Sequence, residues 1–122
     1  MLGYATIGTN DIDKACSFYD ALLAELGAKQ MFGQDRIKFY GDGKGPMLAV
    51  CIPYDENEQH QGNGNMIAIP APKEKVDQLY AKALELGATC DGEPGDRIPN
   101  VFYGAYVRDL DGNKLCFYEM NM

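Results

Sequence analysis

The sequence predicts an α+β fold built from two similar modules, each with a strand, one helix and two or three further strands. Three observations support this prediction: two amphipathic helical patterns, a Leu-Gly-Ala motif after each of them, and β-forming runs placed alike around both. The motif occurs at residues 26–28 and again at 86–88, an offset of 60 in a chain of 122 residues. Half a chain of this size buries too little surface to fold alone, so we expect both modules to pack into one domain, 1–122.

The first helix is expected over residues 12–26. Apolar residues recur at spacings of three and four from Ala15 to Leu26, which is the pattern of a helix with one buried face. Thr, Asn and Asp at residues 9–11 are candidate N-caps, and Gly27 follows the last apolar position. These signals define a complete helix with a start and a stop.

The second helix shows the same periodicity from Val76 to Leu86. Pro72 precedes it and Gly87 follows it, in agreement with the usual asymmetry of proline before a helix and glycine after it. We therefore expect a helix that ends at Gly87.

Short β-forming runs bounded by glycine-rich turns surround both helices. The polar, glycine-rich residues 54–64 are the expected connector, so that module one covers about 1–53 and module two about 65–122. The expected strands are residues 4–8, 29–32, 36–40 and 47–52 in the first module, and 66–69, a weaker strand near 89, 101–108 and 114–120 in the second.

Composition excludes several classes of protein. Apolar residues make up 46% of the chain and charged residues 24%, which is typical of a globular protein. Eleven Lys and Arg against 18 Asp and Glu give a net charge of −7, which would repel nucleic acid and anionic lipid. We expect no nucleic-acid partner.

The sequence also indicates where the protein is located. It has no signal peptide and no apolar segment long enough to span a membrane, so we expect no membrane association. The four cysteines are widely spaced and form no CxxC pair. This pattern predicts reduced thiols and a cytoplasmic location.

Two motifs resemble the vicinal oxygen chelate superfamily of glyoxalases, bleomycin resistance proteins and extradiol dioxygenases. Residues 11–19 are similar to its D-x-x-x-A-x-x-F-Y stretch, and residues 109–113 match its D-x-D-G-N turn before the last strand. The resemblance covers nearly the whole chain. It implies two tandem βαβββ modules that form a cup-shaped mixed sheet with a pocket in its concavity, and a homodimer.

The resemblance also implies positions for a divalent metal, which metal-dependent relatives bind through His or Gln in the first strand and Glu in the last strand of each module. These positions fall on Tyr4, Ala49, Met66 and Cys116, none of which supplies an imidazole, amide or carboxylate. Such residues are poor ligands for a hard or borderline divalent ion. We predict no family-type metal and no cofactor; a soft Cu(I) site at Met66 and Cys116 is a less favoured alternative.

The predicted ligand pocket comprises alternate residues of the strands that would line the cup. Its apolar and hydroxyl side chains suit an aromatic or otherwise planar ligand, although the same side chains also suit a filled core, and the sequence favours neither. The pocket residues are Tyr4, Thr6, Cys51, Met66, Cys116 and Tyr118.

Other reactive residues have simpler interpretations. His60, the only histidine, lies in the polar connector, which favours a solvated loop residue over a general base. Cys116 is expected to pack rather than act as a nucleophile, because Glu119 should point to the other face of its strand. Arg36, Arg97 and Arg108 are candidates for carboxylate binding, but the sequence singles out none of them.

Two functional classes follow. The favoured one is a small-molecule-binding protein of the glyoxalase/bleomycin resistance type without the usual metal set. The alternative is a glyoxalase-like lyase or isomerase, or a dioxygenase-related enzyme, with an altered active site. A filled cup would instead indicate an interaction or structural module.

Overall fold

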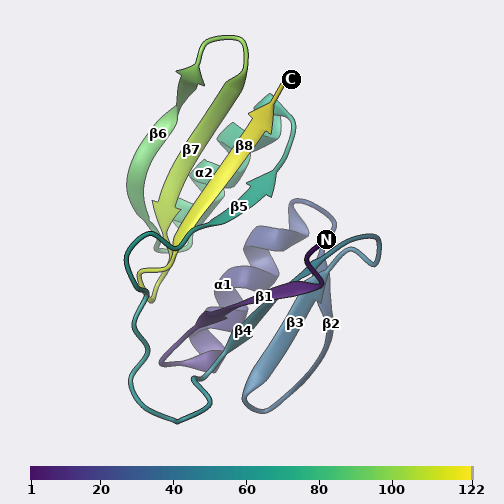
Figure 1. Cartoon of the computed structure of the whole chain (residues 1–122), viewed down its shortest axis with the longest axis vertical. Helices are drawn as coiled ribbons and strands as arrows, with labels where there is room; N and C mark the ends of the chain where they lie inside the picture. The colour runs from purple at the N-terminus through teal and green to yellow at the C-terminus, as the bar shows by residue number, and fades with distance from the viewer. Residues whose placement is uncertain (122) are drawn as a thin grey trace. The chain divides into compact units, whose positions relative to one another are not determined.

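The computed structural model describes residues 1–121 and divides into two compact units, Met1–Gln61 and Gly62–Met122. Each unit has one helix and one four-stranded mixed sheet (Figure 1). The division falls inside the expected connector. The predicted α+β class and the strand-helix-strand order of both halves are confirmed.

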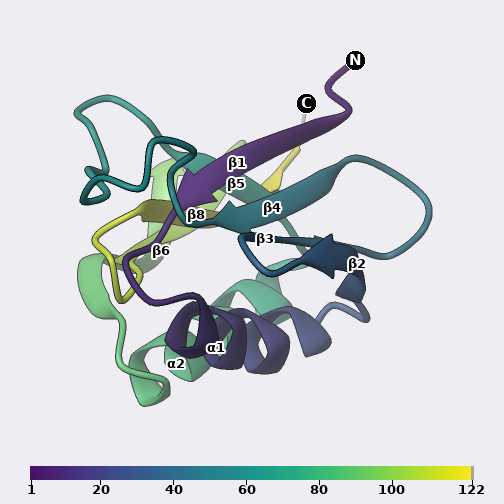
Figure 2. The ribbon, with the colours of Figure 1, turned by 90° about the horizontal axis from the view of Figure 1, so that it is seen from below.

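The first unit contains β1 (Tyr4–Gly8), α1 (Ile12–Ala24), β2 (Lys29–Gln34), β3 (Ile37–Gly41) and β4 (Met47–Cys51). Its strand order is β1-β4-β3-β2, with β1 parallel to β4 and the other pairs antiparallel. Helix α1 lies against one face of this sheet (Figure 2).

The second unit repeats this arrangement with β5 (Ile67–Pro70), α2 (Lys73–Glu85), β6 (Thr89–Ile98), β7 (Phe102–Arg108) and β8 (Lys114–Met120). Its order is β5-β8-β7-β6, and β5 is the strand that runs parallel to its neighbour. The repeat seen in the sequence is therefore a repeat of topology.

Several expected boundaries were wrong. The second helix ends at Glu85, with Leu86 as its C-cap, rather than at Gly87. The first helix ends at Ala24 rather than 26, because Glu25 is its C-cap and the chain turns into Gly27 at a φ of 72°. The weak strand near 89 is a ten-residue strand, Thr89–Ile98, whose pairing with β7 continues through three register shifts. The glycines of this segment lie at or beside these shifts, where β-bulges accommodate them.

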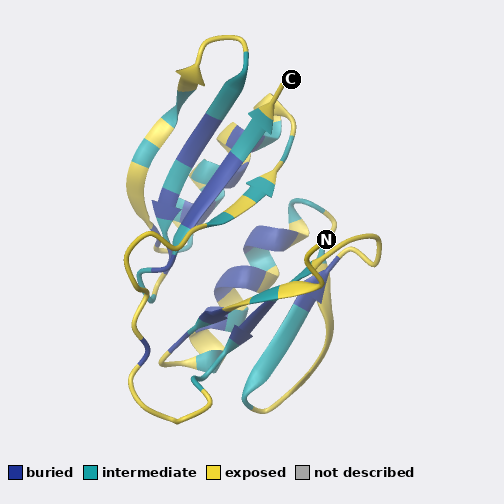
Figure 3. Cartoon of the chain, in the orientation of Figure 1, coloured by how far each residue is buried: buried dark blue, intermediate teal, exposed yellow. Residues whose placement is uncertain are grey.

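The core of each unit lies between its helix and the facing side of its sheet. In the first unit, Asp11 caps α1 by accepting from the Lys14 backbone N–H at 3.1 Å, and the buried face of the helix meets Tyr40 and Val50. In the second unit, Val76 and Leu79 of α2 are fully buried. Figure 3 shows this burial on the central strands, with more exposed residues on the edge strands.

The opposite face of each sheet has no helix of its own unit over it. In β1 the side chains alternate, so that Ile7 is buried while Tyr4 and Thr6 are exposed. The sheet of each unit therefore has one face that its own helix does not cover (Figure 2).

Within residues 1–121, no helix is long and apolar enough to cross a membrane.

The turn before β8 is held together by the buried carboxylate of Asp109, which is 7% exposed. Its oxygens accept from the backbone N–H groups of Asp111 and Asn113, both at 2.9 Å, and from the Asn113 side-chain amide at 3.0 Å. The D-x-D-G-N motif thus closes the β7–β8 hairpin by satisfying its donors with one side chain.

We predict that Asp109→Ala lowers the free energy of unfolding by ~2 to 3 kcal/mol, because buried donors would lose their acceptor. Urea denaturation measures this change. The matched control is Asp42→Ala, which removes one exposed hydrogen bond to the Lys44 backbone N–H and should cost under ~1 kcal/mol. Equal losses for both variants would show that Asp109 has no special structural role.

A second prediction concerns alkaline stability. The Tyr103 hydroxyl donates to Asp77 of α2 at 2.6 Å, and this bond, with a smaller contribution from burial, raises the pKa of Tyr103 to about 12. Since an unfolded tyrosine has a pKa of about 10, the contribution of this group to stability is complete below about pH 10 and is lost as the pH rises toward 12. Urea denaturation at a series of pH values across this range should show a shallower decline in the free energy of unfolding for Tyr103→Phe than for the wild type. Equal slopes would show that the bond to Asp77 does not affect alkaline stability.

Candidate functional site

The first unit contains an open groove of about 560 Å³ beside β1 and β4. The connector after β4 forms one wall, and the exposed side chains of β1 form another. The groove is lined by Tyr4, Thr6, Gly8, Arg36, Ile37, Cys51, Pro53, Tyr54, Asp55, Glu58, Gln59 and His60.

Gln59 of the connector lies against β1 and is only 7% exposed. Its backbone N–H donates to the Asn10 side chain at 2.7 Å. Gly8 permits this approach, because a Cβ at that position would collide with the Gln59 side chain. The connector, which the sequence predicts to be a polar linker, is therefore anchored and forms a wall of the groove.

Arg36 and Tyr54 form the rim of the groove. The Arg36 Nη1 donates to the Ile52 carbonyl at 2.8 Å, and its guanidinium lies 5.3 Å from the centroid of the Tyr54 ring. The same two residues border an adjoining cavity of about 610 Å³. His60 is exposed, as expected, but it also lines the groove.

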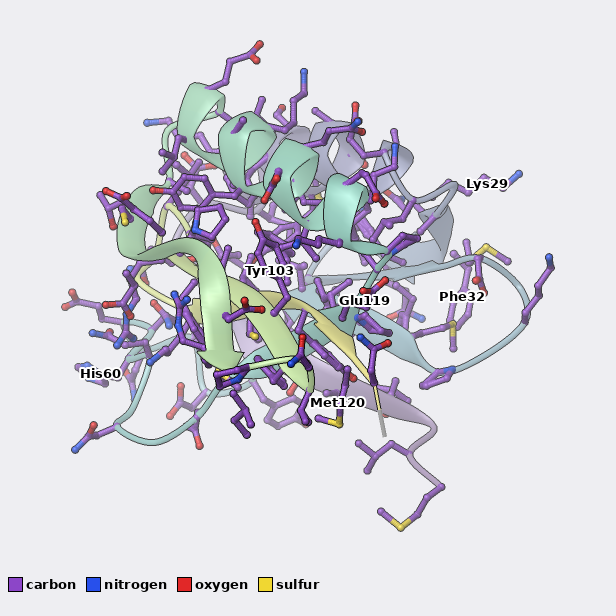
Figure 4. All side chains as sticks on the ribbon, turned by 90° about the horizontal axis from the view of Figure 1, so that it is seen from above. Lys29, Phe32, His60, Tyr103, Glu119 and Met120 are labelled. Atoms are coloured by element: carbon purple, nitrogen blue, oxygen red, sulfur yellow. The ribbon has the colours of Figure 1, made fainter. Side chains whose placement is uncertain are left out.

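A row of aromatic rings extends from Tyr4 across the open sheet face. Phe39 meets Tyr4 edge to face with centroids 4.9 Å apart, and Phe32 stacks on Phe39 at 4.6 Å. Tyr4 and Phe32 are both more than half exposed. Figure 4 shows Phe32 and His60 far apart within the unit, so the row leads away from the connector wall.

The open face of the second unit carries the other predicted pocket residues. Cys116 is fully buried and lies opposite Tyr106 in the β7–β8 ladder. Tyr118 stacks on Phe102 with centroids 5.3 Å apart, and Met66 is 44% exposed. Burial raises the pKa of the Cys116 thiol, although the hydrogen bond with Tyr106 and nearby cations oppose this effect. A raised pKa favours the packing role expected for this cysteine.

The six predicted pocket residues thus fall into two groups. Tyr4, Thr6 and Cys51 come together in the groove of the first unit. Met66, Cys116 and Tyr118 belong to the second unit, on β8 and just before β5. Sequence reasoning missed the connector wall, because only the tertiary contact between Gln59 and Asn10 turns a polar loop toward the sheet.

The residues at the metal positions of the family do not fit a divalent ion. Tyr4 offers a phenol, Ala49 a methyl group, Met66 a thioether and Cys116 a buried thiol with a raised pKa. Among residues 1–121, no three His, Cys, Asp or Glu side chains are grouped in a way that could hold a metal ion. No chemical step is therefore assigned to a metal.

Comparisons with known proteins agree with this architecture. The sequence model of the Glyoxalase/Bleomycin resistance protein/Dioxygenase superfamily matches residues 1–117. A glyoxalase/bleomycin resistance protein from Albidiferax ferrireducens T118 is 31% identical, with a TM-score of 0.91 over 99% of each chain. No curated protein matches the sequence significantly.

Two more distant structures share the fold. A glyoxalase/bleomycin resistance protein/dioxygenase family enzyme from Burkholderia phytofirmans PsJN is 19% identical, with a TM-score of 0.79 over 98% of each chain. A glyoxalase-related enzyme from Fulvimarina pelagi is 20% identical, with a TM-score of 0.76 over 98% of this chain and 87% of the other. The fold is that of paired βαβββ modules, and the chain belongs to the glyoxalase/bleomycin resistance protein/dioxygenase superfamily.

Tryptophan substitutions should separate open positions from filled ones. Cys116→Trp adds bulk at a fully buried position and should lower the free energy of unfolding by ~1 to 3 kcal/mol. Thr6→Trp adds bulk at an exposed position in the groove and should change the free energy of unfolding by less than ~0.5 kcal/mol. Urea denaturation measures both changes, and a negligible loss for Cys116→Trp would reveal open space around the thiol.

Proposed function

We propose that this protein binds a small organic molecule, with planar or aromatic character, and needs no divalent metal to do so. The observation that carries the proposal is the groove of the first unit, where Tyr4, Thr6 and Cys51 meet the connector wall. Its volume of about 560 Å³ lies within the range of small-molecule sites.

The lining suits such a ligand. Exposed aromatic rings supply apolar area, while hydroxyl groups and the Arg36 guanidinium supply polar contacts that fix orientation. The residues at the family's metal positions support metal-independent binding, since they lack imidazole and carboxylate groups.

The proposal includes a cytoplasmic homodimer. Four cysteines without disulfide bonds suit a reducing compartment. Large exposed side chains such as Met31 and Phe32 supply apolar surface that a second copy would cover.

The test is a fluorescence titration with N-phenyl-1-naphthylamine, a neutral planar probe. We expect one probe per chain, with a dissociation constant that changes less than about twofold between EDTA-treated protein and protein supplied with Ni²⁺, Zn²⁺ or Mn²⁺. Thr6→Trp should weaken binding about tenfold by filling the groove, while Thr89→Trp, at an exposed position of the second unit, should not.

Two results would contradict the proposal. Tight binding that requires a stoichiometric divalent ion would favour the lyase, isomerase or dioxygenase-related alternative. Absence of probe binding to the wild type would favour an interaction or structural module.

A further inference from the structure

The open face of the second unit carries a concentration of positive charge. Arg108 and Lys114 are grouped there around one carboxylate, that of Asp91, and Arg97 and Lys114 both lie close to the Tyr106 ring. Asp91 accepts from the Arg108 Nε at 3.0 Å and lies 3.7 Å from the Lys114 Nζ. Three cations on one sheet face are notable in a protein with a net charge of −7.

Arg97 is held flat against the sheet. Its Nη1 donates to the Gly95 carbonyl at 2.9 Å and its Nη2 to the Glu93 carbonyl at 2.6 Å. Its guanidinium carbon lies 5.2 Å from the centroid of the Tyr106 ring. These three contacts immobilise a long side chain. Its immobilisation costs conformational entropy.

Two glycines make this position possible. A Cβ at Gly92 or Gly95 would come within 3.1 Å of a guanidinium nitrogen of Arg97. The backbone of β6 therefore leaves room for Arg97 to lie across it.

The oriented guanidinium retains donors for a ligand. Arginine has five N–H donors, of which the two carbonyls use two. Across the described residues, 1–121, no carboxylate lies within ion-pair distance of Arg97, and the side chain is exposed. The second cation, Lys114, lies 5.3 Å from the same Tyr106 ring.

Aromatic groups continue this face beyond the cations. Phe102 and Tyr118 stack with an interplanar angle of 2°. Tyr118 lies one alternation along β8 from Cys116, a spacing of roughly 7 Å, and Phe102 lies two alternations along β7 from Tyr106, roughly 13 Å. Gly104 accommodates the Phe102 ring, since a Cβ there would approach it to 2.7 Å. Figure 4 shows Met120 on this side of β8, whereas Tyr103 and Glu119 lie toward α2.

We propose that this face binds a planar organic anion, with Arg97 and Lys114 holding its carboxylate or phosphate group and the Phe102–Tyr118 pair packing against its ring. This site lies on the second unit and goes beyond the proposed function, which concerns the groove of the first unit. A planar fork with two donors directed at one group is the geometry that arginine uses to bind carboxylates and phosphates.

The experiment is an NMR titration of the ¹⁵N-labelled full chain with 2-naphthoate, 2-naphthyl phosphate and 2-naphthamide. The amide is the neutral match of the carboxylate, and the phosphate arm identifies which anion is preferred. We expect shifts at the amides of β6, β7 and β8, and at least one anion binding about tenfold more tightly than the amide.

Substitutions assign the preference to the cations. Arg97→Gln should reduce the ratio of amide to anion dissociation constants to about one, and Lys114→Gln should reduce it severalfold. Lys29→Gln removes an exposed lysine of the first unit, labelled in Figure 4, and should leave the ratio unchanged.

Several outcomes would overturn the inference: equal affinity for anion and amide, a preference that survives Arg97→Gln, or no binding by any of the three compounds. Shifts confined to the first unit would also overturn it. In each case, metal-independent binding of the neutral probe in the groove would still support the proposed function, so the two failures are distinguishable.

Discussion

In each unit a single helix packs against one face of a four-stranded sheet, and this one-sided burial determines what the other face can do. Leu22 of α1 and Leu79 of α2 are fully buried in these layers. Because side chains alternate along a strand, burying one set on the helix side presents the next set on the open side. Tyr4, Thr6 and Tyr118 are on the open faces for this reason.

The two open faces have diverged although the topology of the units is repeated. The first unit has an aromatic row and a groove walled by the connector. The second has a stacked aromatic pair and a group of cations around Tyr106. Residues that face a helix are constrained by close packing, whereas those on an open face are freer to vary, so chemical differences between the repeats collect there.

Close approach of side chain to backbone shapes both faces. Gly8 admits Gln59 in the first unit, and Gly92 and Gly95 admit Arg97 in the second. Because glycine has no Cβ, the Gln59 side chain can lie beside Gly8, and the Arg97 guanidinium can lie beside Gly92 and Gly95.

The sequence by itself determined the α+β class, the repeat and most strand positions, since periodicity and caps are local properties. Only the tertiary structure decided that Gln59 returns to β1, that β6 continues through its glycines, and that Arg97 lies over Tyr106. Each of these depends on contacts between segments distant in the chain or on bulged strand pairing, for which local patterns carry no signal.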